Sequence, residues 1–190
     1  MSAKTRRFVP RLECFDERAL PSVSYVLSGA TLFVHGDAAA NTITINDNGS
    51  ATGVSVTSSD GNNWSNLNGV TITHVFVDTQ DGDDTVTYNL TGTLAVNRLV
   101  DASLGLGADT FTANIAGTSL ATLVNLDISA NGGDRGGRDT LVLNAQGVST
   151  DPNSILNVNF AGAGGKDNII LDYTAGVELG SVLLTKDQHH

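Results

Sequence analysis

Four aspartates fall at two matching turns of this chain. Asp81, Asp83 and Asp84 lie within four residues of one another, and Asp109 occupies the position equivalent to Asp84 one repeat later. Carboxylate oxygens are preferred ligands of Ca²⁺, which takes six to eight oxygens in total. Asx side chains also cap turns, because they accept hydrogen bonds from nearby backbone N–H groups. The spacing therefore indicates either a cation site or a set of capped turns.

These aspartates belong to a frame that occurs five times. An Asx residue opens a run of four residues that mostly alternate in polarity, a second Asx follows five positions after the first, and a glycine stands three or four residues later. The opening residues are Asn41, Asp84, Asp109, Asp139 and Asp167. The closing residues are Asn46, Asn89, Asn114, Asn144 and Asp172, and the glycines are Gly49, Gly92, Gly117, Gly147 and Gly176. Recurrence of a whole motif, and not only of strand spacing, is typical of stacked repeats.

Each copy carries two short strands and cannot bury its apolar row alone. Stacking the copies about 4.8 Å apart lets every strand pair with its equivalents. The sequence therefore predicts an all-β fold, a parallel β-helix or β-solenoid of about five rungs, with a β-sandwich as the alternative. The predicted inward columns are Ile43, Val86, Phe111, Leu141 and Ile169, and then Ile45, Tyr88, Ala113, Leu143 and Leu171. Threonines between them should face outward, and the closing asparagines should stack as a ladder at one corner.

The two ends of the repeat array differ from its middle. Residues 50–70 contain two short alternating runs around Asp60-Gly61, which predicts a hairpin insertion capping the first rung, with Trp64 shielding the core. At the other end, Val142 and Ile170 replace outward threonines, and residues 180–185 resemble a first strand without a second. These features predict that the C-terminal rungs pack against a further rung, a cap or a partner subunit, including self-association.

Composition limits the classes of partner. The chain has 190 residues, enough for one domain, and a net charge of −10, with half of its ten basic residues in the first 18 positions. The acidic remainder argues against binding to nucleic acid or to anionic membrane surfaces and is compatible with cation binding or with solubility alone. Cys14 is the only cysteine, so no intrachain disulfide can form. No apolar run reaches transmembrane length, and we expect no membrane insertion.

The N-terminal segment differs in composition from the rest, and we divide the chain into a basic leader over residues 1–24 and a repeat domain over residues 25–190. Residues 11–20 have the apolar spacing of a short helix. Residues 8–22 resemble the LEPR-XLL motif of planctomycete bacteria through Leu12, Glu13, Glu17, Arg18, Leu20, Pro21 and Ser22. That resemblance implies an exported or cell-surface protein, although the apolar block of a conventional signal peptide is absent.

A second resemblance concerns the turns. Gly105-Leu-Gly-Ala-Asp109-Thr-Phe111 satisfies the Gly-x-Gly-x-Asp core of calcium-binding RTX repeats, and the long spacing of the motif is similar to that of planctomycete surface and calcium-binding-like repeat proteins. The resemblance implies calcium as a cofactor. The implied metal ligands are Asp81, Asp83, Asp84, Gly105, Gly107, Asp109, Asp139 and Asp167. Arg135, Arg138 and Lys166 fall in the last two turns and are expected to neutralise carboxylates there instead.

Catalytic signals are weak. His35 and His74 lie in strand contexts without a nucleophile signature, and no phosphate loop or zinc spacing is present, so we expect no catalytic residues and no enzyme. The expected function is a structural or adhesive module, stabilised by calcium, with a cell-surface polysaccharide or protein as partner. The alternative is a β-helix that binds or cleaves carbohydrate. Exposed Trp or Tyr beside carboxylates along one sheet would favour the alternative, and a bare Thr/Asn face would favour the structural module.

Overall fold

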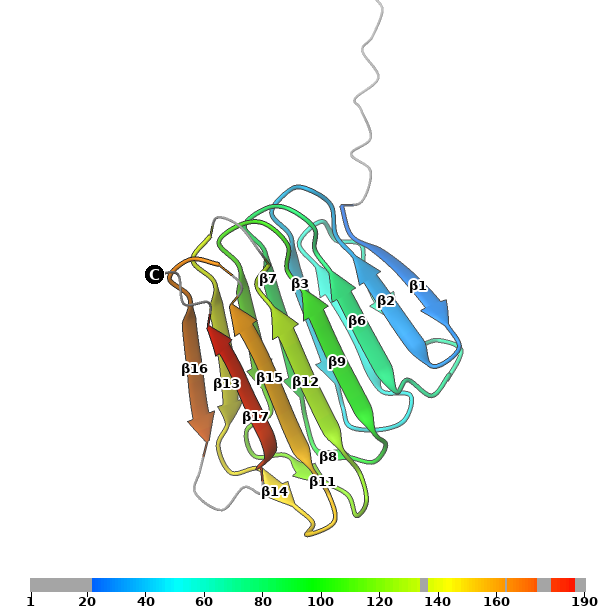
Figure 1. The fold of residues 1–190 in the computed structure, drawn as a ribbon. Coiled ribbons are helices and arrows are strands. Elements are labelled where there is room, and N and C mark those ends of the chain that lie inside the picture. Colours follow the sequence, from blue (N-terminus) through cyan, green and yellow to red (C-terminus); the bar gives the residue numbers. More distant parts are fainter. Residues whose placement is uncertain (1–21, 134–136, 163, 174–178, 187–190) are drawn as a thin grey trace, which may run out of the picture.

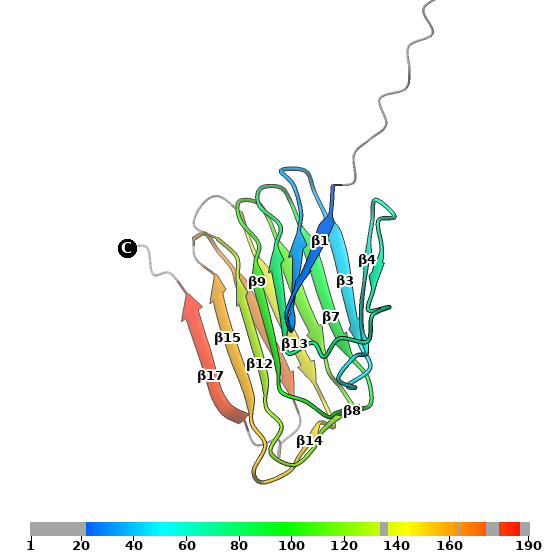
Figure 2. The ribbon, with the colours of Figure 1, turned by 90° about the vertical axis from the view of Figure 1, so that its right-hand side faces the viewer.

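The computed structural model describes residues 22–133, 137–162, 164–173 and 179–186. Within these ranges the chain is entirely β, without a helix, and winds into a β-solenoid of about four turns. The predicted solenoid is confirmed, since successive copies pair in parallel and not as the hairpins of a sandwich (Figure 1). Viewed from the side, two sheets face each other across a thin core (Figure 2).

The first sheet, called sheet A here, has the strand order β1-β2-β6-β9-β12-β15-β17. Its strands are β1 (Ser24–Ser28), β2 (Thr31–His35), β6 (His74–Asp78), β9 (Arg98–Ser103), β12 (Leu126–Asn131), β15 (Leu156–Gly162) and β17 (Leu179–Lys186). From β2 to β17 every pairing is parallel. The orphan strand predicted at 180–185 is therefore real, and it lies against β15.

The second sheet, sheet B, contains all five copies of the frame. Its order is β16-β13-β10-β7-β3-β4-β5, and the strands are β16 (Asn168–Tyr173), β13 (Thr140–Ala145), β10 (Thr110–Asn114), β7 (Thr85–Leu90), β3 (Thr42–Asp47), β4 (Val54–Ser58) and β5 (Trp64–Ser65). The frames stack in register, so that Phe111 lies between Val86 and Leu141. Threonines alternate with these residues on the outer face, as predicted.

A third sheet was not predicted. It has three two-residue strands, β8 (Thr93–Leu94), β11 (Ser119–Leu120) and β14 (Ser149–Thr150), which pair in parallel at the corner after sheet B. β8 begins directly after Gly92, and β11 and β14 begin two residues after Gly117 and Gly147. Gly49 and Gly92 at this corner have φ angles of 82° and 78°, a left-handed conformation that disfavours side chains. The glycine therefore turns the chain into the third side of the rung.

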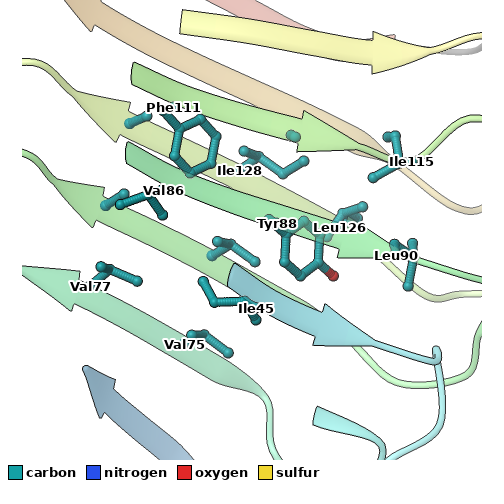
Figure 3. Packing of buried hydrophobic residues seen from close by; sticks show 14 of the residues in the cluster. Ile45, Val75, Val77, Val86, Tyr88, Leu90, Phe111, Ile115, Leu126 and Ile128 are labelled. Carbon is teal, nitrogen blue, oxygen red and sulfur yellow. The ribbon is translucent and has the colours of Figure 1, made fainter. Parts of the chain in front are cut away.

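The core consists of the predicted inward columns. Ile43, Val86, Phe111 and Leu141 are fully buried, and so are the opposing residues Val77 and Phe160 of sheet A. Phe111 and Phe160 meet edge to face across the two sheets, with ring centroids 5.8 Å apart. Figure 3 shows Val86, Phe111 and Ile128 pointing into the same thin layer, together with Tyr88, whose hydroxyl also lies inside.

Antiparallel strands close the N-terminal end. β4 pairs with β3 and β5 with β4, which confirms the predicted hairpin, and Trp64 is partly buried against the core, as expected. The strand β1, which was not predicted, pairs antiparallel with β2 through the two-residue loop Gly29-Ala30. Val23 is fully buried, and its N–H donates to Asp60 Oδ2 at 3.0 Å.

The C-terminal end has no such closure among the described residues, because no described strand pairs with the outer edge of β16 or β17. Ile170, which the sequence places on the outer face, is 42% exposed. Several predicted features lie outside the described residues: the helix at 11–20, Arg135, Gly176 and all of the leader motif except Ser22. The division into leader and repeat domain stays a prediction.

Candidate metal site and the ladders around it

The opening Asx residues form a continuous column along the stack. Each carboxylate accepts a hydrogen bond from the backbone N–H of the Asx one rung earlier. Oδ1 of Asp84 accepts from Asn41 at 2.7 Å, and Oδ1 of Asp109 accepts from Asp84 at 2.8 Å. Oδ1 of Asp139 accepts from Asp109 at 3.0 Å, and Oδ1 of Asp167 accepts from Asp139 at 3.1 Å. The column therefore caps turns, as the alternative to a cation site predicts, but it caps the turn of the neighbouring rung.

These carboxylates are deeply buried. Asp84 and Asp109 have no exposed surface, and Asp139 is 1% exposed. The second oxygens of Asp84, Asp109 and Asp167 have no hydrogen-bond partner among the described residues. On its other side, the Asp139 carboxylate packs against Gly132, where a Cβ would lie 2.2 Å from Oδ2. Asp84, Asp109 and Asp167 thus each have one oxygen that accepts a hydrogen bond and one buried oxygen that accepts none. Burying such an unpaired oxygen in its charged form costs free energy.

Burial dominates the acid–base properties of the column. Loss of hydration, together with the nearby carboxylates of Asp139 and Asp84, raises the pKa of Asp109 to about 7, against the lowering effect of the Asp84 N–H. Burial also raises the pKa values of Asp84 and Asp139 above the ordinary range, again opposed by the N–H bond each accepts. Asp109 is consequently the member of the column whose raised pKa falls near neutral pH.

The two glycines of the motif are required by the close approach of neighbouring turns. A Cβ at Gly105 would lie 1.3 Å from the carbonyl oxygen of Gln80, and one at Gly107 would lie 1.8 Å from that of Gly82. The positive φ of Gly105, 89°, adds a second requirement. Gln80 replaces the first glycine one rung earlier and keeps a φ of 68°, with its side-chain amide donating to Gly36 O at 2.6 Å.

The remaining predicted ligands lie outside the column. Asp81 and Asp83 are exposed, and Asp83 Oδ1 accepts the backbone N–H of Ala108 at 2.9 Å. Across the described ranges, no group of three or more His, Cys, Asp or Glu side chains is arranged to hold a metal ion. The structure thus brings Asp84, Asp109, Asp139 and Asp167 together, places Gly105 and Gly107 against carbonyl groups of the preceding turn, and leaves Asp81 and Asp83 at the surface.

The fit to calcium is therefore partial. The column offers single unpartnered oxygens, whereas Ca²⁺ needs six to eight ligands. Arg138, expected to neutralise carboxylates, instead donates from Nε to the carbonyl oxygen of Lys166 at 3.0 Å. Within the described chain, the one ion pair is elsewhere, between Arg98 and Asp47.

The closing asparagines form the predicted ladder. The Nδ2 of Asn89 donates to Asn46 Oδ1 at 3.2 Å, and that of Asn114 donates to Asn89 at 3.0 Å. The Nδ2 of Asn144 continues the series to Asn114 at 2.6 Å. Asp172 occupies the next position, and its Oδ1 accepts from Gln146 Nε2 at 2.6 Å. Unlike the carboxylate column, this ladder is partly exposed to solvent.

A smaller asparagine column, not predicted, lies at the corner that leads into sheet A. Asn97 Oδ1 accepts the N–H of Asn125 at 2.8 Å, and Asn125 Oδ1 accepts the N–H of Ile155 at 3.0 Å. Here each side chain caps the rung that follows it. The direction of capping is therefore opposite to that in the Asp column.

Sequence reasoning also missed a buried polar cluster. Arg98 Nε donates to Asp47 Oδ2 at 2.7 Å, and Tyr88 donates its hydroxyl to the same oxygen at 2.9 Å. Arg98 Nη2 also reaches the carbonyl of Ser50 at 3.1 Å, while Nη1 has no partner among the described residues. Arg98 and Asp47 are each 1% exposed. Burial, then the charge of Asp47, raises the pKa of Tyr88 well above its ordinary value.

Signals for this cluster exist in the sequence. Arg98 aligns with Leu126 and Leu156 in sheet A, and Asp47 aligns with Leu90 in sheet B, so each is a single charged residue in an apolar column. Without knowledge of the strand register, neither Arg98 nor Asp47 can be recognised as a buried charge. Together they tie the loop after β3 to the start of β9.

The outer face of sheet A carries aromatic residues near its N-terminal end. Phe33 stacks on His35 at 6.2 Å and meets Phe76 edge to face at 5.9 Å, and His74 lies 6.4 Å from Phe76. In register, Asp78 lies beside His35 and Asp101 beside Phe76. The outer face of sheet B, by contrast, carries mainly Thr and Asn. The two faces therefore differ in what they offer a ligand.

One pocket lies at the N-terminal end, between β1 and β5. Its volume is about 390 Å³, and it is lined by Leu27, Asn63, Trp64, Ser65, Asn66, Leu67 and Asn68. Asn66 is tied inward, because its Nδ2 donates to Val70 O at 2.6 Å. The pocket has no charged lining residue.

No known protein family, no curated protein and no solved structure matches this chain. In the part of the chain that the structure covers, no helix is long and apolar enough to cross a membrane.

Proposed function

We propose that this protein is a non-catalytic structural module, built to stack rungs and to present an even surface. The observation that supports the proposal is that the carboxylates and amides of the repeat form hydrogen bonds between neighbouring rungs. Asp84, Asp109 and Asp139 each bond to the backbone of the preceding rung. The amide of Asn114 and its equivalents bond to one another along the stack. Groups engaged in this way hold the fold together and leave little free chemistry for catalysis.

The proposal includes an exported or cell-surface location and a structural or adhesive role there. It rests on the resemblance of residues 8–22 to the planctomycete leader motif and of the repeats to surface proteins. The test is protease treatment of intact producing cells. A surface protein should be cleaved from intact cells, whereas protection until lysis would contradict this location.

Stabilisation by calcium is a second part of the proposal. The specific support is the set of buried, unpartnered carboxylate oxygens on Asp84, Asp109 and Asp167. A cation near this column would reduce repulsion between stacked carboxylates, and a ligand that binds only the folded state raises its stability. Thermal unfolding at pH 8 should therefore shift upward with millimolar CaCl₂ relative to a chelator. An unchanged midpoint, or an equal shift with MgCl₂ and in Asp109→Asn, would contradict a calcium site in this column.

Carbohydrate binding is the alternative function, favoured by one observation. Phe33 and Phe76 lie side by side on the outer face of sheet A, and Asp101 follows Phe76 in register. Aromatic rings beside carboxylates suit the apolar face and hydroxyl groups of a sugar. The test is affinity electrophoresis in gels containing cell-surface polysaccharide. Retardation that Phe76→Ala removes and Thr112→Ala keeps would support sugar binding on sheet A, and equal mobility with and without polysaccharide would exclude it.

A further inference from the structure

The C-terminal end of the solenoid exposes residues that belong to the core. Val182 and Leu184 lie in register with the buried Val158 and Phe160 of β15, yet they are 37% and 45% exposed. Tyr173, beyond the buried Ala145, is 49% exposed. Half of the large hydrophobic side chains that are exposed in the described chain lie on β16 and β17. Concentration of apolar surface on two neighbouring edge strands marks an interface.

The backbone at the C-terminal end also indicates an interface. β16 and β17 are the outermost strands of their sheets, so each presents a row of N–H and C=O groups that no described strand satisfies. Unprotected edges of this kind are templates for further strands. At the opposite end the chain protects both sheets by adding antiparallel strands, β1 on β2 and β4 on β3. The fold therefore accepts an antiparallel strand on each sheet.

We propose that the occupant of the C-terminal end is a second copy of this chain, bound end to end about a two-fold axis. An axis perpendicular to the two facing sheets places β17 against β17 of the second copy and β16 against its equivalent, both antiparallel. That operation keeps every inward residue inward, so Val182 and Leu184 enter a continuous core. A two-fold interface is self-complementary and closes at two copies.

The size of the end surface is sufficient for a modest dimer. At about 3.3 Å per residue, strands of six and eight residues are roughly 20 and 26 Å long, and the two sheets lie about 10 Å apart. The surface buried is then roughly 400–500 Å² on each copy, close to the lower limit of about 1,000 Å² in total for a specific interface. We expect a micromolar dissociation constant. Because each copy carries a net charge of −10, salt should strengthen the dimer by screening repulsion.

Sedimentation velocity over a range of concentrations tests the proposal. The full-length chain should convert from monomer to dimer, and Val182→Lys with Leu184→Lys should raise the dissociation constant at least about tenfold. The matched control is Leu183→Lys, because Leu183 lies on the outer face of the same strand and is 57% exposed. Circular dichroism of each variant checks that the solenoid is folded. A monomer at every concentration, or equal weakening by the control, would overturn the proposal.

The arrangement of the copies needs a separate measurement. In a Cys14→Ser background, spin labels at Thr185→Cys should give short distances between the two copies, and labels at Leu67→Cys, in the N-terminal hairpin, should give long ones. Both labels retain the residues of the proposed interface core. Short distances at Leu67 would show that the copies meet through their N-terminal ends, and open-ended oligomers in place of dimers would show a head-to-tail arrangement. Either result would overturn a two-fold dimer through the C-terminal end.

Discussion

The two Asx corners of sheet B look alike in sequence and differ in chemistry. At the opening corner, carboxylates are buried and accept N–H groups from the preceding rung. At the closing corner, amides are partly exposed and bond to one another. An amide has both a donor and an acceptor, so identical amides can form an endless ladder, whereas a carboxylate has only acceptors and needs the backbone. The choice between Asp and Asn at each corner follows from this difference.

A second contrast concerns buried carboxylates. Asp47 has a guanidinium, a hydroxyl and the N–H of Gly49 around it. Asp109 accepts one N–H, and no cation among the described residues forms an ion pair with it. The buried carboxylate of Asp47 is therefore stabilised by several partners, whereas burial of Asp109 raises its pKa and favours partial protonation. Four measurements, in descending order of expected effect, test this contrast.

The largest effect should come from Arg98→Leu. It leaves Asp47 buried without its cation, and breaking a buried ion pair from one side costs about 3–5 kcal/mol. The double variant Arg98→Leu with Asp47→Leu should recover most of the loss, because the residues paired with them on the neighbouring strands, Leu126 and Leu90, are leucines. Urea unfolding of the single and double variants measures this, with the exposed Arg138→Leu as a control. A double variant as unstable as the single one would show that the pair is not interchangeable with apolar packing.

Asp109→Ala should rank second. It removes the acceptor of the Asp84 N–H inside the stack, which costs about 1–3 kcal/mol, with an added cost for the space left behind. Asp109→Asn keeps an acceptor oxygen and should retain most of the stability, as Asn41 at the head of the column illustrates. The urea midpoints of Asp109→Ala and Asp109→Asn measure the two losses of stability. Equal losses would mean that the carboxylate stabilises the fold in some way other than accepting the Asp84 N–H.

The pH dependence of stability comes next. The pKa of Asp109 is raised in the folded state to about 7 from an ordinary value of 3.8, so folding favours the protonated form. The contribution of Asp109 to the stability of the folded state is fully present below about pH 4 and is lost as the pH rises through 7. The midpoint of thermal unfolding should therefore fall between pH 4 and 8 in low salt and without divalent cations. Asp109→Asn should flatten this slope, and a wild-type midpoint that rises over the same range would contradict it.

The smallest effect should come from Asn114→Ala. It interrupts a partly exposed ladder in which water can replace the lost amide bonds, so we expect a loss of about 0.5–1.5 kcal/mol. The comparison with Asp109→Ala uses two residues of the same strand repeat, measured by the same urea unfolding. A larger loss at Asn114 than at Asp109 would reverse the assignment of the buried corner as the stronger one.

Periodic features were predictable from the sequence. The columns through Phe111 and Ala113 and the asparagine ladder follow from residues that repeat in register, since a repeat reports which side chains will be neighbours. The capping hairpin follows instead from a local turn signal, Asp60-Gly61 between two alternating runs. The strand β1 and the third sheet were missed, because their signals are a two-residue loop and two-residue strands.

Single departures from the repeat were not predictable. Arg98 and Asp47 lie 51 residues apart, and each looks like an isolated surface charge until the stack places them together. The raised pKa of Asp109 was equally hidden, because it depends on burial by the neighbouring rungs and not on the motif itself. For the predicted calcium ligands, the residue types alone could not show which carboxylate oxygens already accept a backbone N–H.

The hydrogen bonds of the Asp column all run in one direction. The N–H of each rung is satisfied by a carboxylate that comes later in the chain, from Asn41 to Asp84 and onward to Asp167. In a stack that lacks its later rungs, the opening Asx of the last rung would therefore have a backbone N–H without its carboxylate acceptor. Because each acceptor comes later in the chain, the N–H of an opening Asx can be capped only after the following rung has been synthesised. A chain truncated after Asn144 would leave the Asp139 N–H without its acceptor, the carboxylate of Asp167.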